Sequence, residues 1–188
     1  MVAFENLEVA AQSVGSAPVE AEDCLQAYQR QLDYLIGSLR RLGVLYPDIE
    51  DVLHEVFLVM FTRWNDYDRA RPIRPWLFGI AFRVASAQRR KVVREVPSGD
   101  HEAVDTSQGP DDNLAAVQNR ALLQKALAGV PLERRAVLIM HEVDETPMRE
   151  IAAELAIPLF TAYSRLRKAR HEFQTALLRL QKGGPSVR

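Results

Sequence analysis

Apolar residues recur every three or four positions along most of this chain, which is the spacing of one face of an α-helix. Asp48 and Pro75 are residue types that favour the start of a helix, and Gly43 is one that favours its end. Three periodic stretches lie in the first half of the chain, at residues 22–42, at residues 48–61 and from Pro75 onward. The pattern predicts that this half is entirely helical.

Two shorter periodic stretches surround a turn in residues 146–170. Thr146 can cap the first helix with its hydroxyl, Pro147 fits its first position, and Pro158 ends it and opens the second. The second stretch has an apolar stripe, and its opposite side carries polar and basic residues: Tyr163, Ser164, Arg165, Arg167, Lys168 and Arg170. This pattern predicts a helix-turn-helix whose second helix reads the major groove of DNA. The alternative is a basic helix face that is merely solvated.

Residues 96–112 combine turn-forming and acidic residues with few apolar ones, which is typical of a linker. We therefore expect an all-α protein with two small helical domains joined by a flexible acidic linker. The domains span residues 22–95 and 113–182. An N-terminal extension of residues 1–21 precedes them, and a tail of residues 183–188 follows.

The net charge of −1 conceals a strong segregation of charge. Residues 63–94 carry nine basic and two acidic side chains, and residues 120–188 carry twelve and seven. Residues 1–62 carry ten acidic and three basic side chains, and residues 95–119 carry six acidic side chains and none that is basic. Two basic blocks indicate two contacts with a polyanion, and the acidic blocks leave a surface for another partner.

Asp48, Asp51 and Glu55 are three and four residues apart, so they share one side of the predicted helix over residues 48–61. Like charges at this spacing repel one another. The alignment therefore favours a cationic partner outside the chain. An ordinary solvated acidic face is the alternative.

Aromatic residues and arginines interleave in residues 63–91. Trp64 and Tyr67 lie in the connection before the predicted helix, and Arg83, Ser86 and Arg90 share one of its outer faces. Aromatic platforms with cationic neighbours are suited to extruded bases, which stack on the rings while the charges hold the backbone. Alternatively, Trp64, Tyr67 and Trp76 belong to the core.

The order of these segments resembles the sigma-70 family of bacterial transcription initiation factors, and the short two-domain form resembles its extracytoplasmic-function (ECF) group. DIEDVLHEVFLVMF, residues 48–61, is similar to the family's core-polymerase-binding helix. Residues 72–90, with PWLFGIAFR, are similar to its −10 recognition and promoter-melting segment, and residues 130–170 to its −35 reader.

The resemblance implies that Asp48, Asp51 and Glu55 bind the clamp helices of the largest subunit of core RNA polymerase. It also implies two sets of contacts with promoter DNA. The helix from Tyr163 to Arg170 would bind the −35 element, and Arg83 with its neighbours would bind the unstacked −10 strand. Such factors are commonly held inactive by an anti-sigma factor, and the resemblance implies one here.

Five positions depart from the family pattern. Arg83 and Ala87 stand where Asn and Asp are frequent, which puts the base preference at the melted element in doubt. Glu145 and Phe160 stand where Gly is usual, which affects the docking angle of the recognition helix. His54 replaces a usual Gln and keeps a hydrogen-bonding group.

Enzymatic motifs are missing from the sequence. Each of the four histidines is followed by Glu, but none has a second His four residues on, so the zinc-protease pattern fails. There is no GxSxG elbow and no GxxxxGK[ST] phosphate loop. We expect no catalytic residues, no metal and no cofactor.

The sequence also bears on targeting and on disulfide bonding. No apolar run approaches the length of a membrane span, and the N-terminus lacks the basic and apolar regions of a secretory signal. A single cysteine, Cys24, excludes an internal disulfide. We expect a cytoplasmic protein without membrane insertion.

The sequence thus predicts an ECF-like sigma factor that binds core RNA polymerase and directs it to promoters. Two other classes of protein are kept as alternatives. One is a helix-turn-helix repressor or activator that binds duplex DNA as a dimer. The other is a helical adaptor that binds only protein.

Overall fold

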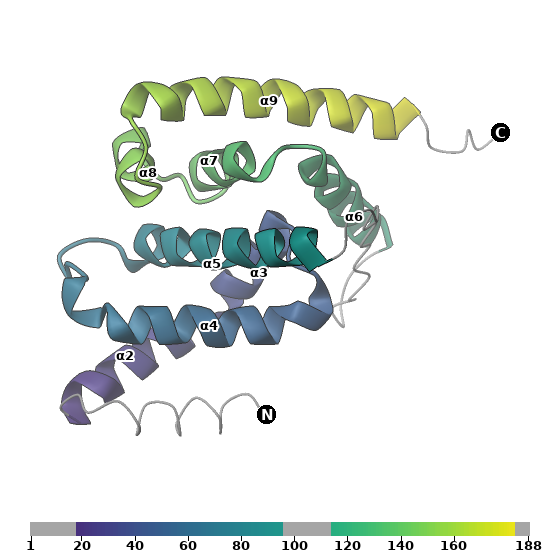
Figure 1. The fold of residues 1–188 in the computed structure, drawn as a ribbon. Coiled ribbons are helices and arrows are strands. Elements are labelled where there is room, and N and C mark those ends of the chain that lie inside the picture. The colour runs from purple at the N-terminus through teal and green to yellow at the C-terminus, as the bar shows by residue number, and fades with distance from the viewer. Residues whose placement is uncertain (1–17, 96–113, 183–188) are drawn as a thin grey trace.

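Residues 18–95 and 114–182 are described by a computed structural model, and every regular element in these two stretches is a helix (Figure 1). The first stretch contains α2 (Pro18–Arg30), α3 (Leu32–Leu42), α4 (Ile49–Thr62) and α5 (Ile73–Glu95), with 3-10 helices η1 (Tyr46–Asp48) and η2 (Trp64–Asp66). The second contains α6 (Leu114–Ala128), α7 (Leu132–Glu142), α8 (Met148–Glu154) and α9 (Leu159–Lys182). The all-α fold is confirmed, whereas the predicted linker, the tail and most of the N-terminal extension lie outside the described residues.

Several helix ends differ from the prediction. The periodic stretch 22–42 forms two helices, because the backbone leaves the helical region at Gln31 (φ −108°, ψ 5°). Gly43 ends α3 in the left-handed region (φ 93°), as the sequence predicted. Pro75 lies inside the first turn of α5, which already begins at Ile73.

The cap of the first helix in the helix-turn-helix was predicted wrongly. α8 begins at Met148, Pro147 occupies the cap position, and no side chain caps the helix. Thr146 is buried and its backbone N–H donates to the carbonyl of Met140 (2.8 Å). Asp48 does occupy the cap position of α4, but its side chain makes no capping hydrogen bond.

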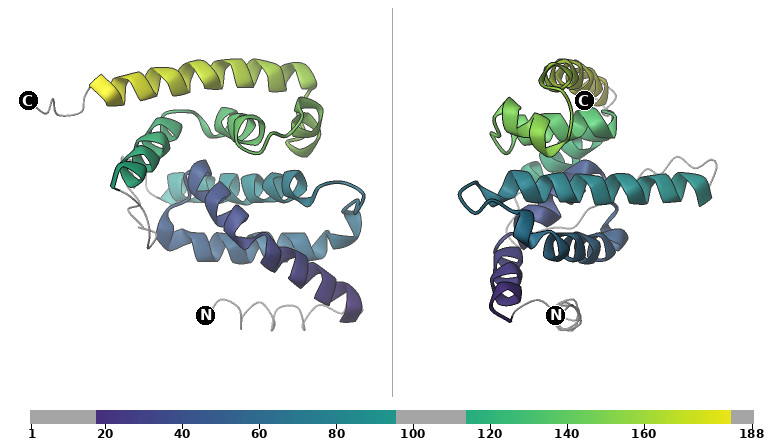
Figure 2. Two further views of the ribbon diagram at one scale, coloured as in Figure 1. Left: turned by 180° about the vertical axis from the view of Figure 1, so that it is seen from behind. Right: turned by 60° about the vertical axis from the view of Figure 1, so that its left-hand side comes forward.

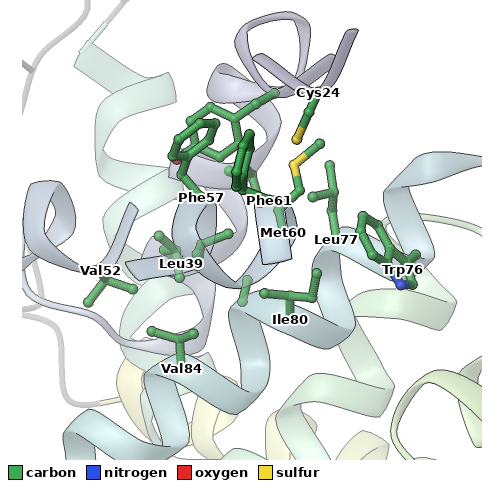
Figure 3. Close-up of a cluster of buried hydrophobic side chains, with 14 of the residues drawn as sticks. Cys24, Leu39, Val52, Phe57, Met60, Phe61, Trp76, Leu77, Ile80 and Val84 are labelled. Atoms are coloured by element: carbon green, nitrogen blue, oxygen red, sulfur yellow. The ribbon is translucent and has the colours of Figure 1, made fainter. Parts of the chain in front are cut away.

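The first hydrophobic core joins α2, α3, α4 and α5. Figure 3 shows its side chains converging between the helices, among them Phe57 and Met60 of α4 and Leu77 of α5. Tyr28 meets the ring of Phe57 edge-on at a centroid distance of 5.1 Å and donates its hydroxyl proton to the carbonyl of Leu53 (2.7 Å). This pairing fixes α2 against α4 while the hydroxyl of Tyr28 keeps a hydrogen-bond partner.

The second core lies between α7, α8 and α9. Ile151 and Leu155 of α8 pack with Leu166 of α9 in one buried cluster. The turn between α8 and α9 passes through Ala156, whose φ of 52° lies in the left-handed region. Glu145 before α8 has the same φ of 52°. The turns before and after α8 therefore both place a residue other than glycine in the left-handed region.

The two halves of the chain pack against each other in successive layers. From one side to the other they are α4, α5, the pair α7 and α8, and finally α9 (Figures 1 and 2). Leu42 and Phe78, from the first half, belong to the second core. Arg135 of α7 is buried and donates to the carbonyls of Leu42 (2.8 Å), Ala128 (2.9 Å) and Val130 (2.9 Å).

Candidate nucleic-acid interface

The basic side of α9, which we call the recognition face, consists of the six predicted residues Tyr163, Ser164, Arg165, Arg167, Lys168 and Arg170. Tyr163, Arg167, Lys168 and Arg170 are exposed, while Ser164 and Arg165 are half-buried. The opposite stripe of Ala162, Leu166 and Ala169 is buried in the second core. Because α9 is anchored by this stripe, its basic side faces outward from the layer of α7 and α8.

Two features of α9 were not predicted. Phe160, in its first turn, is 83% exposed, and it lines a shallow hollow together with Tyr163 and Arg167. Arg170 forms an ion pair with Glu142 of α7 at 2.6 Å. The Arg170 guanidinium holds the pKa of Glu142 below its usual range. Arg170 is thereby fixed in position. The negative charge of Glu142 weakens the electrostatic attraction of Arg170 for an external anion.

The predicted melting face of α5 consists of Arg83, Ser86 and Arg90. Arg83 and Arg90 are exposed and Ser86 is half-buried. The Nη1 atom of Arg83 donates to the carbonyl oxygen of Glu154 in α8 (2.9 Å). In this structure the arginine predicted to meet a DNA strand therefore binds the other half of its own chain.

The aromatic residues before α5 form a compact stack. The rings of Tyr67 and Trp76 lie 4.9 Å apart, and those of Trp64 and Tyr67 lie 5.6 Å apart. Trp64 and Trp76 are buried, at 7% and 8% exposure, and both belong to the first core. Trp64 thus differs from the expected platform for bases, because its ring is enclosed by its neighbours. Tyr67, which is half-buried, keeps part of its surface available.

A groove of about 200 Å³ lies between this aromatic stack and α8, and we call it the α5–α8 groove. Arg63, Arg71 and Tyr67 line one side of it, and Glu150 and Glu154 line the other. No sequence pattern indicated that α8 contributes to this site, because the contact joins residues that are far apart along the chain. Arg63 also pairs with Asp66 within the same wall (3.2 Å).

The predicted acidic face of α4 differs in exposure among its three residues. Asp51 and Glu55 are exposed, and Asp48 is half-buried. Carboxylates in the first turn of a helix interact favourably with its dipole, which offsets part of their mutual repulsion. Leu58, one turn beyond Glu55, is 37% exposed and adds an apolar element to this face that was not predicted. The sequence could have indicated this exposure, because Leu58 lies outside the apolar stripe of the helix.

Comparison with known proteins identifies the family. The profile of the family described as Sigma-70, region 4 matches residues 120–172, which include α7, α8 and the first part of α9. The ECF RNA polymerase sigma factor SigL of Mycobacterium tuberculosis is 30% identical over 157 residues, which are 82% of this chain and 89% of SigL. The chain belongs to the ECF group of RNA polymerase sigma factors. It is therefore a transcription initiation factor.

Two further proteins similar to this sigma factor cover most of its length. RNA polymerase sigma factor NccH of Alcaligenes xylosoxydans is 27% identical over 159 residues, covering 81% of this chain and 85% of NccH. The sigma factor RpoE of Bartonella quintana, in a co-crystal with the anti-sigma factor NepR, superposes with a TM-score of 0.70 at 21% identity. That match covers 84% of this chain and 98% of RpoE, and it shows that the fold is shared.

The described residues of this sigma factor contain neither a membrane span nor a group of metal ligands. None of their helices is long and apolar enough to cross a membrane. Within the same residues, no three side chains of His, Cys, Asp or Glu are grouped so that they could hold a metal ion.

Proposed function

We propose that this sigma factor uses three separate surfaces. The acidic face of α4 binds the clamp helices of the largest subunit of core RNA polymerase. The recognition face of α9 reads the −35 element, and the melting face of α5 with Tyr67 holds the opened −10 strand. In this division residues 22–95 form one functional domain and residues 113–182 the other, with residues 96–112 between them.

The exposed recognition face is the observation that carries the proposal. Four of its six side chains are exposed, and three of these are cationic. A helix with such a face fits the major groove, where Arg and Lys reach phosphates and base acceptors. The helix-turn-helix geometry presents this face at the surface of the second core.

An anti-sigma factor is the further partner that we propose. The related sigma factor RpoE was solved in complex with the anti-sigma factor NepR, and the related sigma factor CnrH in complex with the cytosolic domain of CnrY. Such a protein would cover the same surfaces that bind polymerase and DNA. We place this protein in the cytoplasm, where it would meet polymerase and promoter DNA.

Reversing charge on α4 tests the proposed polymerase contact. We expect Asp51→Arg with Glu55→Arg to abolish co-purification with core RNA polymerase, because cationic clamp helices would then meet like charge. Asp23→Arg with Asp33→Arg makes the same change of net charge at exposed sites on α2 and α3 and should leave binding intact. Wild-type binding by the α4 variant would instead favour a helix-turn-helix regulator without a sigma role.

A further inference from the structure

We propose that α8 lies against the strand-binding side of α5 in place of promoter DNA, so that Glu150 and Glu154, which form one wall of the α5–α8 groove, compete with an opened DNA strand for Arg63, Arg71 and Arg83. This inference rests on the proposed role of α5 and adds a means of regulating it within the chain. The free sigma factor would mask its own strand-binding site until the two halves separate.

The contacts of Glu154 provide the first argument. Its backbone carbonyl accepts a hydrogen bond from Arg83, and its side chain lines the groove opposite Arg63 and Arg71. Burial raises the pKa of the Glu154 carboxyl, while Arg71, Arg83 and Arg63 each lower it. Three arginines of the first half therefore act on one carboxylate of the second half.

Gly79 provides the second argument, because it allows α8 to come this close. A Cβ atom at this position of α5 would lie 3.1 Å from the carbonyl oxygen of Glu154 and 3.4 Å from its Oε2 atom. The first distance is tighter than ordinary van der Waals contact, so a side chain here would push α8 away. Figure 1 shows α8 above the end of α5 that adjoins the connection from α4, where the groove lies.

The chemistry of the two ligands provides the third argument. Guanidinium groups bind carboxylates and phosphates with the same charge-assisted geometry. Glu150 and Glu154 are four residues apart, so their side chains lie on one side of α8. Two carboxylates on one side of a helix can thus replace phosphate oxygens of a DNA strand at the same arginines. They also exclude the strand sterically from Tyr67, which lines the groove.

Contacts outside the groove hold the two halves in this arrangement. The hydroxyl of Tyr34 in α3 donates to Oδ2 of Asp144 at 2.8 Å, and Arg135 donates to the carbonyl of Leu42. Phe78 of α5 is fully buried in the second core. The closed state therefore has its own packing and polar contacts, and the pair of carboxylates adds the competition with DNA.

Binding of a fluorescein-labelled single-stranded oligodeoxynucleotide of mixed sequence to the full chain tests this inference. Glu150→Gln with Glu154→Gln keeps the shape of α8 and removes its charge, so we expect about threefold tighter binding or more as the open fraction rises. Glu133→Gln with Glu145→Gln is the matched control, since both residues are exposed in the second half and neither lines the groove. Gly79→Ala, which changes no charge, should also tighten binding.

The outcomes separate the inference from the proposed function. An affinity of the α8 variant equal to that of wild type, an equal gain in the control, or no strand binding by any variant would overturn the inference. Promoter-specific run-off transcription by the wild-type chain with purified core polymerase tests the function independently. A chain that starts transcription correctly but shows no gain in the α8 variant keeps its function and refutes the masking.

Discussion

Phe160 leaves most of its ring in solvent at the first turn of α9, beside the cationic residues of the recognition face. Burying a Phe side chain is worth about 1.5–3 kcal/mol, so this exposure forgoes a substantial stabilisation. N-terminal residues of a recognition helix are those that reach base edges, and Phe can contact the methyl group of thymine. A partner surface that covers Phe160 would recover this stabilisation.

We expect Phe160→Ala to weaken binding of a duplex containing the −35 element by about fivefold, which corresponds to about 1 kcal/mol. Fluorescence anisotropy with a second duplex, in which deoxyuridine replaces thymine, would isolate the methyl contact. Wild type should lose affinity for this duplex, and the variant should not distinguish the two. Leu178→Ala, at an exposed site farther along α9, is the control. A loss on Phe160→Ala that is the same for both duplexes would contradict a methyl contact.

At the scale of elements, helical periodicity predicted the positions of α4, α5, α8 and α9 and the buried side of α9. It did not predict the break at Gln31, because the apolar spacing continues across residues 22–42 while the backbone turns. Nor did it predict that Trp64 is buried while Tyr67 is only half-buried. Both are aromatic residues in one short connection and both contact Trp76, so their difference in burial becomes visible only in the folded chain.

The positive charges of the recognition face should together determine how strongly promoter binding depends on salt. We expect Arg165→Ala with Lys168→Ala to weaken promoter binding and to lower the slope of log K against log salt by about 0.9 for each phosphate that the variant no longer neutralises. Arg179→Ala with Lys182→Ala removes the same charge from the far end of α9 and serves as the control. Binding measured over a range of salt concentrations checks both. An unchanged slope in the first variant would argue that these residues contact only protein.

At the scale of the whole molecule, the contact between the two halves could not be predicted from the sequence. The hydrogen bond from Arg135 to Leu42 joins residues 93 positions apart, and that from Tyr34 to Asp144 joins residues 110 apart. Neither separation along the chain is one from which a contact can be predicted. Arg135 also has the form of a surface residue within a basic block. Its burial, which lowers its pKa to about 10, becomes visible only when both cores are assembled.

The Asp144 carboxyl at this contact makes the stability of the closed state depend on pH. Burial raises its pKa, although Tyr34, Arg41 and Arg74 oppose the shift. The folded chain therefore binds this proton more tightly than the unfolded chain does, and its stability rises as the pH falls through the raised pKa.

Asp144→Asn keeps an oxygen acceptor for Tyr34 without the buried charge. We expect the variant to be at least as stable as wild type at neutral pH and the difference to shrink on acidification. Urea unfolding of both chains at neutral and mildly acidic pH measures this. If the stability of the variant relative to wild type instead rises as the pH falls, the carboxylate is the stabilising form.

Cys24 lies fully inside the first core, and its burial raises the pKa of its thiol to about 12. It is the single cysteine of the chain. Maleimide reagents attack the thiolate, which this residue hardly forms while the chain is folded. Cysteines introduced at one exposed position in each half would consequently take up donor and acceptor dyes without competition from the native thiol, and energy transfer between them would report the separation of the halves directly.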